Sequence, residues 1–425
     1  MGTYQIAGID VHKRMLAVVI ADVESGGEYE FQYHRTATTP DQLRALADWL
    51  TAHDVQEVVA ESTAQYWRPV WEALERYWQP GCRNRPEAGP AAGALHLAQA
   101  KSNRAPGGRK NDFAEAERLV KRHVAQELIL SFVPSPEQRL WRTVTHRKHQ
   151  LMGDKVRLQN QLESFLEEAH IKLSSLVSDL LGQSGRRILH ALAEGGSQPE
   201  VLAALADRAL RATQAQLCDA LGAAAHLSPV YRRLLKMTLE QLKVLEDHID
   251  QLDQEIAGML QPHRAAVQRL AEVPGLGPDS AQQIIAEIGP TAATFPSEKQ
   301  LASWVGVCPG QQESAGVSQS SRSPKGNQAM RRILNQAAHA AAKVKGSIFE
   351  VKFQALKRGR SYKEAIWAIA HRLCRLIWKV LHQQIHYQER GPAVSAKSQK
   401  IRTSKMIRAL RRLGYTVAPS HPQPA

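Results

Sequence analysis

The first 125 residues are the most constraining part of this chain, because short β-rich runs alternate with helical segments in a definite order. Two β-rich runs, 4–10 and 16–22, are separated by a polar turn, and residues 28–36 can supply a third strand. Thr39-Pro-Asp-Gln42 then offers the spacing of a capping box, with proline at the first helical position. We therefore expect three strands to precede the first helix.

The elements that follow continue this alternation. Residues 56–61 are typical of a strand, 66–78 of a helix, 94–98 of a short strand, and a helix should begin close to Asp112. Three strands, helix, strand, helix, strand and helix is the order of the ribonuclease H-like fold, a mixed sheet flanked by helices. We predict an α/β domain of this class at the N-terminus.

Four acids occupy related positions in this predicted fold: Asp10 ends the first strand, Glu61 ends the fourth, and Asp112 and Glu115 lie three apart on the last helix. The first and fourth strands can lie side by side and parallel, so both carboxylates would emerge at one sheet edge. Residues three apart share a helix face. Converging carboxylates need a cation, and hard divalent ions prefer oxygen ligands. Two such ions would suit the attacking and leaving oxygens of a phosphodiester.

Each acid also has a simpler interpretation. Asp10 and Glu61 can begin turns after their strands. Asp112 and Glu115 can be a solvated acidic pair that the helix dipole favours at a helix start. Their joint placement at these positions favours the metal site.

The remainder of the 425 residues is expected to be mainly helical, in two to four domains overall. Apolar seams at residues 140–166 and 231–260, the second close to a heptad pattern, predict two antiparallel or intermolecular coiled-coil helices. Smaller helices between 182 and 227 would cap this hairpin. We interpret the whole segment as a structural spacer or dimer stalk.

Residues 271–289 resemble a helix-hairpin-helix, in which Gly275 and Gly277 form the tight turn. Backbone N–H groups at such a helix start can hold a phosphate, although a plain packing unit has the same pattern. Residues 311–327 form a loop rich in serine and glycine before a basic helix. By its composition the loop is a flexible linker, and it has no His or Asp to activate a serine.

The net charge of +14 is concentrated at one end of the chain. From Ser320 onward 22 Lys and Arg face three acids, a net +19, so the first 319 residues carry −5. Such a segment suits a polyanion partner, with nucleic acid first and an anionic membrane second. Its basic residues are interleaved with apolar helix-period positions, which argues against a merely solubilising tail.

The cysteines and the absence of certain segments suggest where the protein works. Four widely spaced cysteines without a C-x-x-C pair indicate neither a disulfide framework nor a zinc ribbon. We find no apolar run long enough to span a bilayer and no secretory signal, and we expect a cytoplasmic protein.

Several short motifs resemble the DEDD transposases of bacterial insertion sequences, the one-ten family, which is related to the pilin-gene invertases. They lie in the family's order between Ile6 and about Leu381: Gly8-Ile-Asp-Val-His-Lys13, Glu61-Ser-Thr-Ala-Gln-Tyr66, Lys110-Asn-Asp-Phe-Ala-Glu-Ala116, Val273-Pro-Gly-Leu-Gly277, Cys308-Pro-Gly-Gln-Gln-Glu-Ser-Ala-Gly316, Lys325-Gly-Asn327 and Arg331-Arg332.

This resemblance implies a Holliday-junction-resolvase-like catalytic domain (1–134), a coiled coil (135–268), a transposase domain (269–385) and a basic tail (386–425). It implies recombination of donor and target double-stranded DNA, guided by a structured bridge RNA, through a phosphoserine intermediate. A homodimer or homotetramer without membrane contact, associated with the nucleoid when active, is expected. The implied site residues are the Mg²⁺ ligands Asp10, Glu61, Asp112 and Glu115, the nucleophile Ser314, and the nucleic-acid-binding residues Gly275, Gly277, Arg322, Lys325, Asn327, Arg331 and Arg332.

The chain departs from the family pattern at the fourth acid, Glu115, where aspartate is usual, and beyond about Gln383. Two other functions fit the same residues. One is a metal-dependent, structure-selective junction nuclease in which water replaces Ser314 and no covalent intermediate forms. The other is an architectural nucleic-acid-binding protein, in which Asp10 and Asp112 would be dispensable.

Overall fold

The computed structural model describes residues 4–23, 29–61, 64–80, 94–100, 102–103, 111–310, 312–314, 317–320, 322–391 and 396–417, and for 312–314, 317–320 and 396–399 it describes only the backbone. The chain divides into two units, Met1–Pro136 and Glu137–Ala425. None of the described helices is long and apolar enough to cross a membrane.

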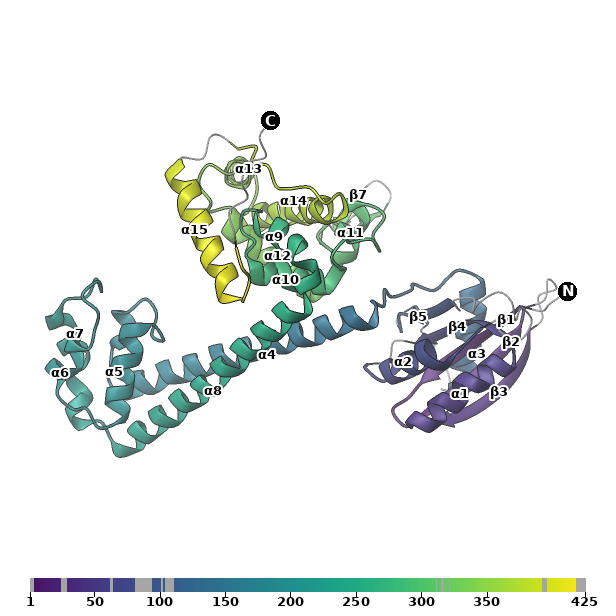
Figure 1. The fold of residues 1–425 in the computed structure, drawn as a ribbon, viewed down its shortest axis with the longest axis horizontal. Coiled ribbons are helices and arrows are strands. Elements are labelled where there is room, and N and C mark those ends of the chain that lie inside the picture. Colours follow the sequence, from purple (N-terminus) through teal and green to yellow (C-terminus); the bar gives the residue numbers. More distant parts are fainter. Residues whose placement is uncertain are drawn as a thin grey trace. The chain divides into compact units, whose positions relative to one another are not determined.

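A five-stranded mixed sheet with strand order β3-β2-β1-β4-β5 forms the N-terminal unit (Figure 1). Strands β1, β2 and β3 make an antiparallel meander, and β4 and β5 extend the sheet parallel to β1. The predicted element order is confirmed, including the short fifth strand. The bounds are β1 Gln5–Val11, β2 Met15–Asp22, β3 Glu30–Ala37, α1 Pro40–Ala52, β4 Val55–Glu61, α2 Trp67–Tyr77, β5 Ala94–Ala98 and α3 Asp112–Val124.

Both faces of the central strands are covered, which explains their nearly continuous apolar sequences. One set of alternate residues, including Ile9 of β1, packs with α1 and α2. The other set, including Ile6, packs against Ala116 and Val120 of α3. Gly8 belongs to this second set by its position, and a Cβ there would lie 2.4 Å from the Ala116 carbonyl oxygen. The missing side chain therefore allows α3 to lie directly on β1.

The C-terminal unit is mainly helical. Its elements are α4 Pro136–Glu168, α5 Gln183–Ala193, α6 Pro199–Ala204, α7 Gln214–Ala220, α8 Pro229–Met259, α9 Arg264–Ala271, α10 Pro278–Ile288, α11 Glu298–Val305, β6 Gln312–Ser314, β7 Val317–Ser320, α12 Gln328–Ala341, α13 Ile348–Lys357, α14 Tyr362–His382 and α15 Ala396–Arg412. Short 3₁₀ turns lie at Leu173–Ser175, Gly222–His226 and Gln261–His263.

The long helices α4 and α8 run antiparallel within this one chain (Figure 1). Lys148 of α4 pairs with Asp253 of α8, and seven residues further along α4 Lys155 pairs with Glu246, seven residues earlier in α8. One end of this pair packs with α5, α6 and α7, and the other contributes to the core formed by α9 to α14.

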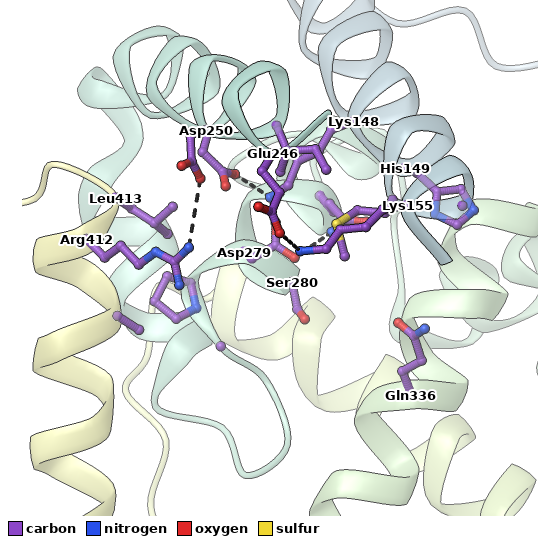
Figure 2. A pocket seen from close by; sticks show the side chains of 18 of the residues that line it. Lys148, His149, Lys155, Glu246, Asp250, Asp279, Ser280, Gln336, Arg412 and Leu413 are labelled. Carbon is purple, nitrogen blue, oxygen red and sulfur yellow. Dashed lines mark hydrogen bonds and ion pairs between the residues drawn. The ribbon is translucent and has the colours of Figure 1, made fainter. Parts of the chain in front are cut away.

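Ion pairs cross between α4, α8 and the start of α10 beside a cavity of about 740 Å³ (Figure 2). Lys148 bonds both Asp253 and Asp279, Lys155 lies 2.7 Å from Glu246, and Arg412 of α15 lies 3.8 Å from Asp250. Acids and bases neutralise each other here, so this cavity is not a basic surface.

The region predicted as a basic tail contains helix α15, whose end joins the core. Leu410, Leu413 and Tyr415 are buried in the cluster that α9 to α14 form. The Tyr415 hydroxyl accepts a hydrogen bond of 2.9 Å from Gln282 Nε2 of α10.

A buried carboxylate, Glu287 at the end of α10, joins three parts of the C-terminal unit. His146 Nε2 lies 2.6 Å away, Arg142 Nε 3.5 Å away, and Asn327 Nδ2 donates a hydrogen bond of 2.8 Å. Burial raises the pKa of Glu287, but the hydrogen bond from His146, the charge of Arg142 and the bond from Asn327 outweigh it and hold the pKa below 4.5. The residue is therefore an ionised hub between α4, α10 and the start of α12.

Substitution of Glu287 by glutamine should cost about 3 kcal/mol of stability, because it leaves a half-buried guanidinium without its carboxylate. The contribution of ionised Glu287 to the free energy of unfolding is complete above the pKa of this residue in the unfolded chain. It disappears as the pH falls through the lower pKa of Glu287 in the folded protein. The difference in thermal midpoint between wild type and Glu287→Gln should thus be full at pH 6 and shrink below about pH 4.5. Glu240→Gln, at an exposed position of α8, is the control and should have the thermal midpoint of wild type. If Glu287→Gln and Glu240→Gln have equal midpoints, Glu287 does not stabilise the unit as described.

Gly275 should resist substitution more than its neighbour Gly277. Gly275 has a φ of +86°, and a Cβ would lie 2.3 Å from the Ala337 carbonyl oxygen, whereas Gly277 has a φ of −114° and open space. Backbone strain alone predicts a loss of roughly 1–3 kcal/mol for Gly275→Ala. Gly277→Ala should be nearly neutral in thermal unfolding, and a larger effect at Gly277 would contradict this packing.

Candidate functional site

Two of the predicted acids meet at the end of the central strands in the N-terminal unit. Asp10 is only 3% exposed and lies on the α3-facing side of β1, since it shares alternation with Ile6 and Gly8. Asp112 is the first residue of α3, and Asn111 caps this helix by accepting a hydrogen bond from the Phe113 N–H. The helix start therefore brings the Asp112 carboxylate to the same edge as Asp10.

His12 lies between these two carboxylates. Its Nε2 is 3.1 Å from Asp10 Oδ2 and 3.1 Å from Asp112 Oδ1. Ligand atoms of the three residues all lie within 4.8 Å of one another, which suits a shared metal ion. Sequence reasoning did not single out His12, although its position two residues after Asp10 was a usable signal, because alternate residues of an extended segment share a face.

Glu61 ends β4 beside β1, as predicted, and has a partner of its own. The β1–β4 pairing ends with Ile9 opposite Ala60. Asp10 and Glu61 are the next residues, so they lie at the same end of two parallel strands. Asn103 Nδ2 donates a hydrogen bond of 2.8 Å to Glu61 Oε2. Arg118 of α3 in turn donates to the Asn103 carbonyl at 3.3 Å, which holds this turn against the helix.

Glu115 lies in the first turn of α3, on the same helix face as Asp112, and is half-buried. The group within 4.8 Å contains Asp10, His12 and Asp112, and neither Glu61 nor Glu115 belongs to it. Their assignment as metal ligands therefore stays a prediction.

The serine-rich loop includes an antiparallel hairpin rather than a linker alone. Strand β6 pairs with β7 through Gln312 with Ser320, Glu313 with Ser318, and Ser314 with Val317. Ser314 thus occupies the last paired position on β6, and its side chain lies outside the described residues.

Glycines bring the two ends of this hairpin together. A Cβ at Gly310 would lie 2.2 Å from the Arg322 carbonyl oxygen, and one at Gly326 would lie 2.2 Å from the Val305 carbonyl oxygen. Asn327 then caps α12, because its Oδ1 accepts from the Met330 N–H at 2.8 Å while its Nδ2 donates to Glu287. The base of the hairpin is accordingly well packed.

A basic cavity of about 1120 Å³ adjoins this base. Its cationic or titratable lining residues are Arg322, Arg331, His339, Arg360, Lys363 and His371. Among the described lining residues Glu364 is the one acid, and its carboxylate accepts a hydrogen bond from the Ser361 N–H at the start of α14. The cavity is therefore suited to an anion.

The predicted nucleic-acid-binding residues fall into two groups. Arg322 and Lys325 are exposed. Arg331 lies 4.5 Å over the Trp367 ring and bonds the Gly306 and Pro324 carbonyls, Arg332 donates to Gln283 at 3.0 Å, and Asn327 is engaged at both ends of its amide. These three already stabilise the hairpin base and α10, and a contact with nucleic acid stays a prediction for all five.

The helix-hairpin-helix turn is present between α9 and α10, with Gly277 at the N-cap of α10. Asp279 lies in the first turn of α10 and bonds Lys148. Gly275 packs against α12, so packing accounts for this glycine directly. Phosphate binding at the turn stays a prediction.

Comparison with known proteins agrees with this organisation. Residues 7–171 match a family model for DEDD transposases of the IS110 type, and residues 267–354 match the model described as Transposase IS116/IS110/IS902 family. A probable family 20 transposase of Pseudomonas aeruginosa is 28% identical over 159 residues, which cover 36% of this chain and 46% of that relative.

Among solved structures, the Thermus thermophilus RuvC structure aligns over 30% of this chain and 99% of that chain, with 12% identity and a TM-score of 0.23.

The two family models match separate stretches in the expected order, one over the acids and one over the turn, the hairpin and α12. The chain belongs to the IS116/IS110/IS902 family of transposases.

Proposed function

We propose that this transposase cleaves and exchanges DNA strands between a donor and a target, guided by a bridge RNA, through a covalent phosphoserine at Ser314. The observation that carries the proposal is the approach of Asp10 and Asp112 to within reach of one cation at a sheet edge. The hairpin that carries Ser314 and the basic cavity beside its base support it.

The donor set of the N-terminal unit fits a divalent cation. Asp10 and Asp112 supply carboxylate oxygens from two different elements, which hard ions such as Mg²⁺ prefer. Bound there, Mg²⁺ would polarise the scissile phosphate and lower the pKa of a nearby hydroxyl. Glu61 and Glu115 lie on the neighbouring strand end and helix turn and would complete the ligand set.

His12 is assigned a positioning role in this site. Its Nε2 hydrogen-bonds Asp112 Oδ1 at 3.1 Å and lies 3.1 Å from Asp10 Oδ2, so the ring spans the two carboxylates. The carboxylates thus stay close to each other before substrate arrives.

The proposed reaction conserves the phosphodiester bond energy. The Ser314 oxygen attacks the scissile phosphorus and loses its proton, the P–O bond to the deoxyribose oxygen breaks, and that oxygen leaves as a hydroxyl. A deoxyribose hydroxyl of the other DNA partner then attacks the phosphoserine, releases Ser314 and joins the strands. Both the acids and Ser314 must act on one phosphate, which a dimer or tetramer assembled on nucleic acid would provide.

RNA and DNA binding is assigned to the C-terminal unit. The basic cavity lies beside the hairpin base, and Arg322 and Lys325 are exposed at the hairpin's end. Contacts of this kind, mainly to phosphates, position nucleic acid without reading its sequence. Sequence choice would then come from pairing with the RNA.

Removal of either central carboxylate should weaken cation binding. Asp10→Asn and Asp112→Asn should each raise the Kd for Mn²⁺ at least tenfold, measured by calorimetry, because each loses a charged oxygen ligand. Asp48→Asn, at an exposed position of α1, is the matched control and should bind as wild type does. If both Asp10→Asn and Asp112→Asn bind Mn²⁺ with the affinity of wild type, the proposed cation site is wrong. Glu115→Gln measures whether the fourth acid contributes.

Ser314→Ala should abolish the covalent protein–DNA adduct while leaving RNA and DNA binding intact. The adduct is measured on denaturing gels after incubation with labelled DNA from the element's ends, with and without the RNA that co-purifies with the protein. Ser318→Ala, on the paired strand, is the control and should keep the adduct. An adduct that persists in Ser314→Ala assigns another nucleophile, and cleavage by wild type without any adduct would favour the junction nuclease. Adduct formation independent of RNA would contradict guidance.

A further inference from the structure

A second group of side chains whose atoms could hold a metal ion lies in the N-terminal unit, outside the acid site. Glu57 is near the start of β4, His96 is in the middle of β5, and His123 is in the last turn of α3. Glu57 alternates with Val59, and His96 with Ala98, and both of these apolar residues pack with Leu119 of α3. The side chains of Glu57 and His96 therefore face α3, the helix that carries His123.

The three side chains converge on one point. Glu57 Oε2 lies 2.6 Å from His123 Nε2 and 3.3 Å from His96 Nε2, and the ligand atoms all lie within 4.8 Å of one another. The imidazole centroids are 4.5 Å apart. The Tyr4 hydroxyl donates to the other oxygen of Glu57, which fixes the carboxylate from its far side.

One buried atom of this group is only weakly satisfied. His96 Nε2 has Glu57 Oε2 3.3 Å away, a contact that is long for a hydrogen bond. In a tetrahedral shell with bonds of about 2.0–2.1 Å, two ligand atoms lie about 3.3 Å apart. The spacing of His96 from Glu57 is thus that of two ligands of one ion, whereas Glu57 and His123, 2.6 Å apart, are hydrogen-bonded and would separate when the ion binds.

The protonation states also suit a metal. Burial, and then the neighbouring His123, hold the pKa of His96 below its ordinary value, so its ring is neutral at neutral pH. Burial raises the pKa of Glu57, but hydrogen bonds from Tyr4 and His123 outweigh it and keep the carboxylate ionised. Neutral imidazole and ionised carboxylate are the metal-binding forms.

We propose that Glu57, His96 and His123 bind a transition-metal ion, with Zn²⁺ as the best fit, at a site separate from the acids. Two imidazoles and one carboxylate are a known ligand set for zinc, whereas Mg²⁺ prefers oxygen ligands alone. Asp112 and His123 lie eleven positions apart on α3, which separates the two sites by about 16 Å. A bound ion would join β4, β5 and α3 and stabilise the unit, whatever reaction the acids perform.

Cobalt is the spectroscopic probe for this site. The full-length protein is freed of metal by a chelator and titrated with Co²⁺ in excess Mg²⁺, which occupies the acid site. Wild type should bind one equivalent with the intense visible absorption of tetrahedral cobalt, and Zn²⁺ should displace it. His96→Asn and His123→Asn should each weaken Co²⁺ binding more than tenfold. Glu57→Gln, which keeps the shape of the side chain but removes its charge, should also weaken Co²⁺ binding.

His53→Asn is the matched control, because His53 is in the same unit but hydrogen-bonds the Trp49 carbonyl at 2.8 Å. It should bind Co²⁺ as wild type does. Zn²⁺ should also raise the thermal midpoint of wild type and of His53→Asn, but not of His123→Asn. If wild type shows no tetrahedral cobalt spectrum, or if the three ligand variants bind as wild type does, the group is a hydrogen-bonded network and the proposal is wrong. The wild-type spectrum decides this even if a variant fails to fold.

Discussion

The close packing of α3 on β1 is the contact on which both of the proposed metal sites depend. Because Gly8 has no side chain, the helix backbone approaches the strand more closely than any other residue would permit. The start of the helix then brings Asp112 to Asp10, and its last turn brings His123 to Glu57. A side chain at position 8 would move both ends of the helix away from the sheet.

The same interface separates apolar from polar groups along its length. Between the two ends, Ala116, Leu119 and Val120 of α3 are fully buried against the sheet. At its ends, the helix carries the partly exposed side chains of Asp112 and His123, where charge costs less to hold. The helix dipole favours Asp112 at the N-terminus and a basic residue such as His123 at the C-terminus. One helix can therefore hold a carboxylate site and an imidazole site without burying either in the apolar centre.

The sequence predicted the sheet edge at which Asp10, Glu61 and Asp112 lie because strand order and helix start can be inferred from local patterns. Strand alternation and the parallel placement of β1 and β4 bring Asp10 and Glu61 to one edge, and the helix cap at Asn111 fixes where Asp112 begins. His12 lies two residues after Asp10, so the same alternation predicts that the two side chains share a face. The side chains of Glu61 and Asn103 meet only after a turn folds back on α3, so no local pattern predicts that contact.

The second group was beyond prediction for the same kind of reason. Glu57, His96 and His123 are separated by 39 and 27 residues and have no motif spacing in common. Their meeting requires the strand register, in which Val59 lies opposite His96, and also the direction in which α3 crosses the sheet. These are properties of the assembled unit, and no single segment contains them.

The serine hairpin shows how a polar loop becomes an ordered element without a core of its own. Its composition predicts a linker, yet Gly310 and Gly326 allow backbone to lie against backbone, and Asn327 connects the loop's end to the buried Glu287. The packing is thus concentrated at the two ends of the loop, where its residues contact Val305 and Glu287.

This arrangement has a chemical consequence for the proposed reaction. A serine hydroxyl is a weak nucleophile until a base or a metal activates it, and among positions 312–320 there is neither His nor Asp. In the proposed reaction, the nucleophile would be held by one unit and the carboxylates by the other. If both are needed at one phosphate, cleavage depends on the assembly that brings them together, and a free protein in a cell full of DNA would remain inactive.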